Sequence, residues 1–217
     1  MESFKTAVFC DFDGTITSKE TLSGMVSHLV PDRWKEILPE MLARRMTLRE
    51  GVKTLVESIP TKRYGEVIDF VMAVPIRPGL EELLDYLDSR GVPLIVISGG
   101  LRGMVEARLG PLKTRVRGIY AVDTDLSGEY IRVSSTHEGE TELMDKPKII
   151  SQYGAEQVIA IGDGFTDINM AQVSDLVFAR DALAQILHKT GKEFIPWNDF
   201  HDIRRELDNR WEAGSGR

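Results

Sequence analysis

The sequence predicts an α/β protein with a Rossmann-like three-layer core, in which a parallel sheet lies between helices, and with an inserted helical cap subdomain. Short apolar runs typical of buried strands alternate with segments of helical periodicity. Three of these runs end in Asp or Ser, and open parallel sheets bind ligands at the carboxyl ends of their strands. A helical block follows the first run. We expect residues 1–17 and 76–217 to form the core and residues 18–75 to form the cap.

The first strand is expected over Ala7–Cys10, an apolar run that leads into Asp11-Phe-Asp-Gly-Thr15. Apolar residues then recur every three or four positions to about residue 74, which predicts the cap helices. The pattern Thr17-x-x-Glu20 has the form of a capping box and is expected to open the first of them. Three prolines are expected to divide this region into three or four helices: Pro31, Pro39 and Pro60.

The rest of the core is predicted as alternating elements. After a linker at residues 75–79, the expected strands are residues 92–97, 119–122, 130–134, 158–161 and 176–179. The second and third of these are expected to pair as a hairpin. The expected helices are residues 80–90, which Gly91 ends, then 102–109, 147–153 and 168–173, with further helices toward the C-terminus.

Composition and charge exclude several classes of function. The chain has 217 residues, enough for one good core with a small subdomain, and a net charge of −7 without a basic tract, so nucleic acid is not an expected partner. No membrane span or signal peptide is evident, which predicts a cytoplasmic protein without a membrane partner. Cys10 is the only cysteine, so no intrachain disulfide can form, and four scattered histidines give no metal-ligand spacing. No feature of the sequence specifies an oligomeric state.

Two carboxylates mark the end of the first strand. Side chains alternate along a strand, so Asp11 and Asp13 are expected to project to one side while Phe12 turns toward the core. Two such charges repel by roughly 4 kcal/mol at about 4 Å and moderate dielectric. A cation must therefore accompany them, or one must stay protonated. The alternative is a turn in which both side chains are solvated or cap the next helix.

Polar residues at other strand ends are expected to join this pair. Ser98 and Asp163 each follow an apolar strand, Asp167 lies nearby, and Lys146 precedes a short helix. Oxygen ligands without histidine or cysteine favour Mg²⁺. With Mg²⁺ and a lysine to offset repulsion, one carboxylate can attack a phosphate ester and a second can act as acid and base. Each residue also has a purely structural interpretation: a tight turn for Ser98, a surface position for Lys146 and a helix N-terminus for Asp167.

This ordered set resembles the four motifs of the haloacid dehalogenase superfamily of phosphohydrolases, and the resemblance covers about residues 6–181. The motifs are Asp11-Phe-Asp13-Gly-Thr15, Ser98-Gly-Gly, Lys146 and Gly-Asp163-Gly-Phe-Thr-Asp167. Each motif is weak alone, but their order along the chain is specific. The resemblance implies a hydrolase that uses Mg²⁺ and passes through an aspartyl-phosphate.

The resemblance also implies a role for each residue. Asp11 would be the nucleophile, and Asp13 the general acid and base. Both would be metal ligands with Asp163, Asp13 through its backbone carbonyl. Phosphate oxygens would be held by Ser98, Gly99 and Lys146. Supporting roles would fall to two residues: Thr15, which orders the loop, and Asp167, which orients Lys146 or a metal-bound water.

The position of the cap resembles the subgroup that contains phosphoserine phosphatase, whose caps close over small metabolites. Several stretches look closer to the methionine-salvage phosphatases that act on 2-hydroxy-3-keto-5-methylthiopentenyl-1-phosphate: Thr47 to Val52, Asp145 to Pro147, Ser174 to Asp181 and Pro196 to Ile203. The chain lacks the cysteine-rich segment of such proteins before Lys146.

The resemblance therefore implies a small phosphorylated metabolite as substrate, with phosphoserine as the alternative. Glu20 is either the carboxylate that meets the ammonium group of phosphoserine or only the capping-box partner of Thr17. No arginine clearly takes the place of the one that binds the serine carboxylate, although Arg49 is nearby. Two alternatives from other classes are a regulatory domain that accepts a phosphoryl group without rapid turnover and a catalytically idle interaction module.

Overall fold

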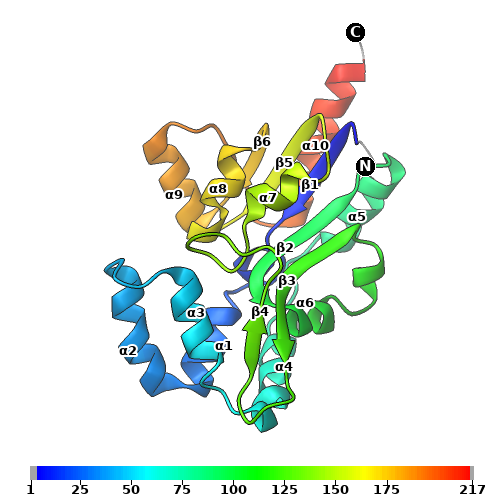
Figure 1. Cartoon of the computed structure of the whole chain (residues 1–217). Helices are drawn as coiled ribbons and strands as arrows, with labels where there is room; N and C mark the ends of the chain where they lie inside the picture. Colours follow the sequence, from blue (N-terminus) through cyan, green and yellow to red (C-terminus); the bar gives the residue numbers. More distant parts are fainter. Residues whose placement is uncertain (1–3, 216–217) are drawn as a thin grey trace.

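The computed structural model describes residues 4–215, in which a seven-stranded sheet runs through the core (Figure 1). Its strand order is β4-β3-β2-β1-β5-β6-β7, and neighbouring strands are parallel except for the antiparallel pair of β3 and β4. The strands are β1 (Thr6–Cys10), β2 (Leu94–Leu101), β3 (Gly118–Asp125), β4 (Arg132–Ser134), β5 (Gln157–Gly162), β6 (Leu176–Ala179) and β7 (Ile195–Pro196). The predicted α/β fold with its parallel sheet is confirmed.

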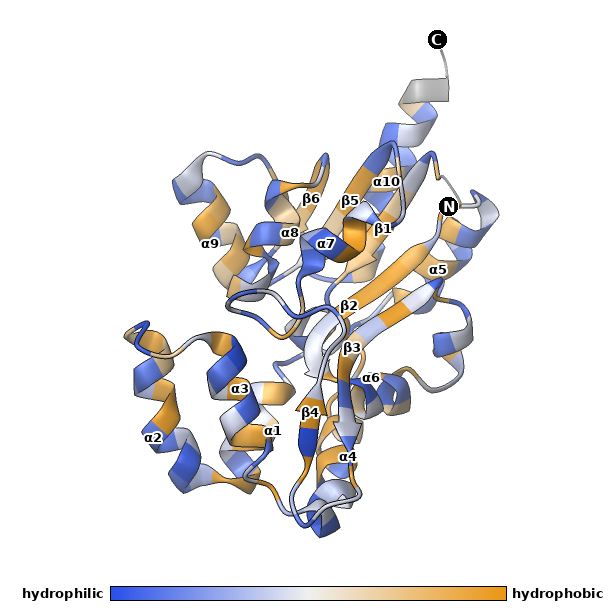
Figure 2. Cartoon of the chain, in the orientation of Figure 1, coloured by the Kyte–Doolittle hydropathy of each residue, from blue (hydrophilic) through white to orange (hydrophobic). Residues whose placement is uncertain are grey.

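Helices cover both faces of the sheet (Figure 1). One face is covered by α5 (Leu80–Ser89), α6 (Arg102–Leu109) and α10 (Phe200–Ser215), and the other by α7 (Lys146–Ser151), α8 (Ile168–Gln172) and α9 (Asp181–Thr190). Strands β2 and β5 are drawn mainly in the hydrophobic colour in Figure 2, and residues 7–10 of β1, which lies between them, are fully buried. Because β1 lies between β2 and β5, the side chains at its carboxyl end enter the middle of the molecule.

Four helices lie beyond the carboxyl ends of β1 and β2, in the lower part of Figure 1: α1 (Leu22–Leu29), α2 (Pro31–Leu42), α3 (Leu48–Val56) and α4 (Tyr64–Met72). The loop of the β3–β4 hairpin reaches this region, where Ile131 N donates to Ile59 O and Thr61 N donates to Glu129 O. The helical block is therefore hydrogen-bonded to the hairpin as well as linked to the core by its two chain connections. No helix among residues 4–215 is long and apolar enough to cross a membrane.

Two expectations for the helical block are wrong. Thr17 and Glu20 form no capping box, because α1 begins only at Leu22 and the Thr17 hydroxyl instead binds the carbonyls of Phe12 and Lys19. A capping box does open α3, between Thr47 and Glu50. Pro39 does not separate helices but lies inside α2, where its missing N–H costs one hydrogen bond.

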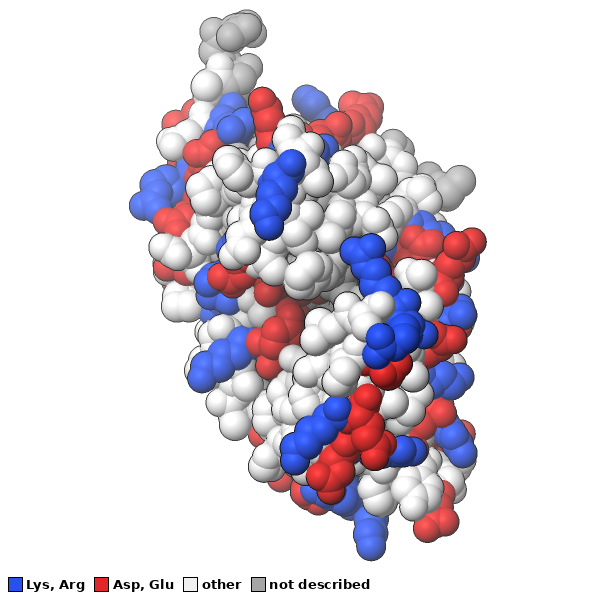
Figure 3. Space-filling view, turned by 90° about the vertical axis from the view of Figure 1, so that its left-hand side faces the viewer, with Lys and Arg blue, Asp and Glu red and all other residues white. Residues whose placement is uncertain are grey.

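The other boundaries agree with the sequence within a few residues, with two differences. Strand β2 does not end at Ser98 but continues irregularly to Leu101, with a register shift against β3. Strand β7 was not predicted, because two residues carry no readable periodicity. The predicted hairpin is confirmed, with Asp123 paired to Ser134. On the face shown in Figure 3, basic and acidic side chains alternate without a continuous basic surface.

Candidate active site

A buried lysine joins two aspartates at the carboxyl end of β1. Lys146, the first residue of α7, places its Nζ 2.6 Å from Asp11 Oδ1 and 2.6 Å from Asp167 Oδ1. The three residues are 1%, 3% and 0% exposed. Lys146 is therefore not a surface lysine, and Asp11 does not lie in a solvated turn. Residues more than 130 positions apart in the chain meet in one cluster.

The end of β5 supplies the next carboxylate. Asp163 Oδ1 accepts a hydrogen bond of 2.6 Å from Thr15 Oγ1, across 148 residues of sequence. Asp167 Oδ2 accepts from the backbone N–H groups of Asp163 and Gly164, at 3.0 and 2.9 Å. Asp167 thus binds Lys146 with one oxygen and fixes the main chain of the Asp163 loop with the other.

The environment of these groups perturbs their protonation. Burial, reinforced by the charge of Asp167, raises the pKa of Asp11 well above its ordinary value. Burial also raises the pKa of Asp163 to about 6, although the Thr15 hydrogen bond opposes it. Burial alone would lower the pKa of Lys146, but the carboxylates of Asp11 and Asp167 raise it above its ordinary value. Lys146 therefore stays protonated. The carboxylates of Asp11 and Asp163 need further positive charge nearby before both can ionise together.

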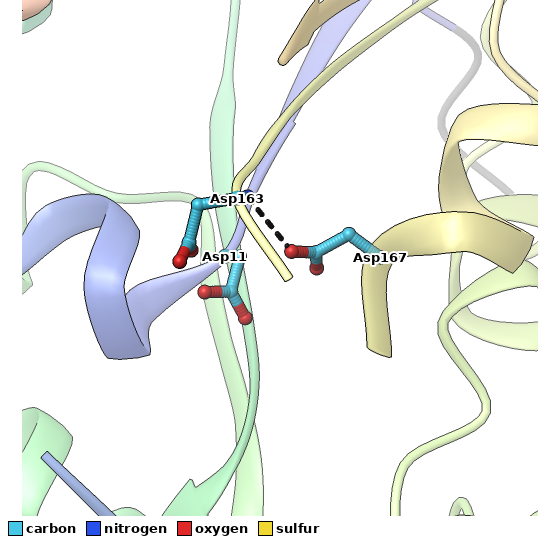
Figure 4. A group of neighbouring side chains, drawn as sticks. All are labelled: Asp11, Asp163 and Asp167. Carbon is cyan, nitrogen blue, oxygen red and sulfur yellow. Dashed lines mark hydrogen bonds between the residues drawn. The ribbon is translucent and has the colours of Figure 1, made fainter. Parts of the chain in front are cut away.

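The acidic cluster fits a divalent cation. One oxygen from each of Asp11, Asp163 and Asp167 lies within 4.8 Å of the others, and in Figure 4 the carboxylates of Asp11 and Asp163 lie next to each other. A Cβ at Gly14 would lie 2.4 Å from Asp163 Oδ2, so only glycine leaves room for this carboxylate. All donors are oxygens, which is the ligand chemistry of Mg²⁺ rather than of zinc or copper.

Asp13 lies apart from this trio, toward the helical block. Its Oδ2 accepts a hydrogen bond of 2.7 Å from Ser98 Oγ, and its Oδ1 accepts from Thr21 Oγ1 and, at 3.2 Å, from Leu22 N. The Ser98 hydroxyl in turn accepts from Gly100 N at 2.8 Å. Ser98 is thus more than a turn residue, because it connects β2 to the second carboxylate of the first motif.

Glu20 lies at the entrance to the cluster. The residue as a whole is exposed, yet its Oε1 lies only 3.9 Å from the position of a Cβ on Gly164. Desolvation at the entrance, with the charges of Asp13 and Asp163, raises the pKa of Glu20 to about 8. Glu20 caps no helix, so its capping-box interpretation is wrong. Its contact with a ligand stays a prediction.

A small apolar pocket of about 80 Å³ opens beside Lys146 and Gly99. Leu22, Leu48 and Val52 line it from the helical block, and the core supplies further side chains: Glu142, Leu143, Met144 and Thr166. Burial raises the pKa of Glu142 to about 7, against the opposing charge of Lys146. The pocket therefore offers an apolar wall with one weakly acidic group, directly next to the predicted phosphate-binding residues.

Two residues of the site were not predicted. Thr21 binds Asp13 from the start of the helical block. Arg77 is 8% exposed and donates to the carbonyls of Gly14 and Thr15 from behind the loop. In the sequence Arg77 lies between two prolines in a linker, and no pattern there distinguishes a buried arginine from a solvated one.

Comparisons with known proteins agree with this geometry. The family model for haloacid dehalogenase-like hydrolases matches residues 8–172. A Microcystis aeruginosa protein named 2-hydroxy-3-keto-5-methylthiopentenyl-1-phosphate phosphatase is 47% identical over 202 residues, which cover 92% of this chain and 96% of that protein. A Bacillus thuringiensis protein of the same name is 32% identical, with 95% of this chain and 97% of that protein covered.

Among solved structures, a phosphoserine phosphatase from T. onnurineus superposes with a TM-score of 0.72 at 18% identity, and 95% of this chain and 96% of that chain are covered. A substrate-bound phosphoserine phosphatase gives a TM-score of 0.68 at 20% identity, with coverages of 95% and 99%. At such identities the likeness shows the fold alone. The family match and the two named relatives go further: the chain belongs to the haloacid dehalogenase-like hydrolase family and is a phosphatase.

Proposed function

We propose that the chain hydrolyses 2-hydroxy-3-keto-5-methylthiopentenyl-1-phosphate, with Asp11 as the nucleophile, in a cytoplasmic step of methionine salvage. The observation that carries the catalytic part is the buried contact of Lys146 with Asp11 and Asp167. Such a cluster is costly to bury and has no packing purpose, but it provides a nucleophile and a fixed cation for a phosphate dianion. The relatives' names support the choice of substrate.

The reaction proceeds in two steps at these side chains. Asp11 attacks phosphorus while the bond to the leaving oxygen breaks, and the phosphoryl group becomes an acyl phosphate on Asp11. Asp13 donates a proton to the leaving oxygen and then accepts one from the water that hydrolyses the acyl phosphate. Lys146, the Ser98 hydroxyl and the main chain of Gly99 hold phosphoryl oxygens. The products are the dephosphorylated metabolite and inorganic phosphate.

Mg²⁺ fits this arrangement. The carboxylates of Asp11 and Asp163 and the backbone carbonyl of Asp13 would hold it. When bound, Mg²⁺ supplies positive charge that offsets repulsion between the phosphate and the acidic cluster. Asp167 takes a supporting role, because both of its oxygens already bind other groups. Thr15 orients Asp163 through the hydrogen bond of 2.6 Å.

The pocket beside Lys146 supports a leaving group with an apolar end. We propose that residues 18–75 act as the cap, with Leu48 and Val52 facing the methylthio end of the substrate. Apolar surface gains roughly 25 cal/mol per Å² when it leaves water. Glu142, half protonated near neutral pH, can hydrogen-bond to a hydroxyl or keto group in the middle of the substrate.

Phosphoserine is the second candidate, favoured by the fold and by Glu20 at the entrance. The pocket argues against it, because the carboxylate group of phosphoserine would need a cation there besides Lys146, and the lining residues offer none. Arg49 does not supply one: its guanidinium donates to Gly139 O at 3.0 Å and lies 3.9 Å from Glu138. A phospho-accepting regulatory domain is disfavoured by Asp13, a second carboxylate placed to promote hydrolysis.

Phosphate release from both substrates by the purified chain with Mg²⁺ tests this proposal. We expect kcat/KM for the methylthiopentenyl phosphate to exceed that for phosphoserine by at least about 10²-fold. An apolar pocket rejects a substrate whose polar groups find no partner there on about this scale. Asp11→Asn should abolish both reactions. A preference for phosphoserine would establish the second candidate. A stable acyl phosphate without release would establish the regulatory domain.

A further inference from the structure

Arg77 binds four consecutive carbonyl groups between the nucleophile strand and the helical block. Its Nη2 lies 2.6 Å from Gly14 O and 3.4 Å from Thr17 O, and its Nε lies 2.9 Å from Thr15 O. Its backbone N–H donates to Ile16 O at 2.8 Å. One residue therefore satisfies every carbonyl in the loop that follows Asp13.

This loop needs an outside partner for its carbonyls. Residues 14–17 are all buried, and Gly14 has a φ of 87°, so the loop cannot continue as a regular strand or helix. A buried carbonyl without a hydrogen-bond donor destabilises the fold. A guanidinium carries several N–H groups in a planar fork and can reach several carbonyls at once, which the single ammonium of a lysine cannot do in the same geometry.

The Arg77 guanidinium is itself fixed by the C-terminal part of the core. Its Cζ lies 5.3 Å from the ring centroid of Trp197, and the Cζ of Arg180 lies at the same distance from that ring. Both arginines donate through Nη1 to Asn198 O, at 3.3 Å for Arg77 and 2.7 Å for Arg180. Trp197 is only 5% exposed. The Trp197 ring and the Asn198 carbonyl thus contact both guanidinium groups.

The loop is connected directly to the reacting groups. Thr15 Oγ1 binds Asp163, and Gly14 leaves the space that the Asp163 carboxylate fills. Asp13, the residue before Gly14, carries the proposed acid and base function. A shift of the carbonyls at 14 and 15 would therefore displace Asp13 and Asp163 relative to Asp11.

We propose that Arg77 is a positioning residue for the phosphoryl-transfer site, with Trp197 and Arg180 as its support. In this role Arg77 holds the loop through its carbonyl groups and does not contact the substrate. The proposal rests on the assigned roles of Asp11 and Asp13. The catalytic assignments give no role to the segment around Pro196–Asn198. This proposal gives that segment a role in supporting Arg77.

The test compares Arg77→Lys and Arg77→Ala with the wild-type chain in steady-state turnover with Mg²⁺. Arg77→Lys keeps a cation but loses the fork, so kcat should fall about 10²-fold, the cost of misplacing reacting groups by about 1 Å. KM should change less than threefold, because the residue does not contact the substrate. For Arg77→Ala, which leaves a space of guanidinium shape, non-denaturing guanidinium chloride should restore part of kcat, whereas equal ammonium chloride should not.

Arg108→Lys is the matched control, because Arg108 Nε also donates to a main-chain carbonyl, that of Val74, but does not reach the loop. Its kcat should stay within twofold of wild type. Wild-type kcat in both Arg77 variants would overturn the proposal, as would a loss of kcat that matches only the unfolded fraction seen by circular dichroism.

If the Arg77 variants do not fold, the variants Trp197→Phe and Trp197→Leu test the proposal instead. We expect Trp197→Phe to keep more of the wild-type kcat, because a phenyl ring can still lie beside the guanidinium groups. Equal losses of kcat in both Trp197 variants would overturn the supporting role of the ring. Activity retained in Asp11→Asn would instead refute the catalytic assignment itself.

Discussion

The rim of the sheet and the surface of the helical block both carry ion pairs, but in opposite environments. At the rim, Lys146 binds Asp11 and Asp167 with side chains that are at most 5% exposed. On α2, Lys35 lies 3.7 Å from Asp32, and these side chains are 75% and 93% exposed. Exposed pairs contribute little to stability, whereas breaking a buried pair leaves a charge without compensation. The comparison shows that the ion pairs of the proposed catalytic site are buried, whereas that of the helical block is solvated.

The helical block contributes apolar contacts to the pocket instead. Leu22, Leu48 and Val52 reach the pocket beside Lys146, while the arginines of the block mostly pair with neighbouring glutamates at its surface, such as Arg33 with Glu36 and Arg63 with Glu66. Substitutions in the core should therefore change rate and stability, and substitutions in the pocket should change the choice of substrate.

The largest effect is expected for Lys146→Met. Without Mg²⁺ the free energy of unfolding should fall by about 3–5 kcal/mol, because two buried carboxylates lose their cation. Activity with Mg²⁺ should fall at least about 10²-fold. Urea unfolding and phosphate release measure the two effects. The matched variant Lys35→Met should change the unfolding free energy by less than about 0.5 kcal/mol. Equal losses of unfolding free energy in both variants would refute the difference between the buried ion pairs at the rim and the exposed pair on α2.

A smaller effect is expected for Val52→Thr, which replaces a methyl group in the pocket by a hydroxyl of similar size. The kcat/KM for the methylthiopentenyl phosphate should fall about tenfold, since the hydroxyl must lose water without gaining a partner. The exposed Val173 lies outside the pocket lining and provides the control Val173→Thr, which should keep wild-type kinetics. Unchanged kinetics in Val52→Thr would show that the apolar pocket does not receive the leaving group.

The smallest effect concerns Mg²⁺ and pH. The pKa of Asp163 is raised to about 6 and that of Asp11 is raised as well, so the metal-free fold binds protons more tightly than the unfolded chain. Its stability from these groups is therefore lost as the pH rises through about 6. The proposed Mg²⁺ would replace those protons, so it should raise Tm more at about pH 8 than at about pH 5, by several degrees. Differential scanning calorimetry measures this, and an equal gain at both pH values would contradict it.

The sequence predicted the strands of the sheet better than the boundaries of the helical block for a physical reason. Strands such as β1 and β5 are buried on both faces and read as unbroken apolar runs, so the polar residue that follows each one is conspicuous. The rim residues Asp11, Ser98 and Asp163 could be found in this way. The ends of helices in the helical block depend on local hydrogen bonds, and Thr17 and Glu20 fit a capping pattern that the chain does not use.

Contacts that form only in the folded chain could not be predicted. Arg77 and Thr21 bind carbonyls and a carboxylate that approach them only in the folded chain, and neither belongs to a motif. The direction of the Ser98 hydroxyl toward Asp13 likewise depends on the path of β2, which continues past Ser98 instead of ending there.

The most direct test of the account is to trap the covalent intermediate. The chain is mixed with substrate and Mg²⁺, quenched in acid within one turnover, reduced with borohydride and digested for mass spectrometry. We predict that reduction, which converts an acyl phosphate to an alcohol, modifies residue 11 and no other aspartate. Modification of Asp13 or Asp163 instead, or turnover without any modified carboxylate, would contradict the assignment of Asp11 as the nucleophile.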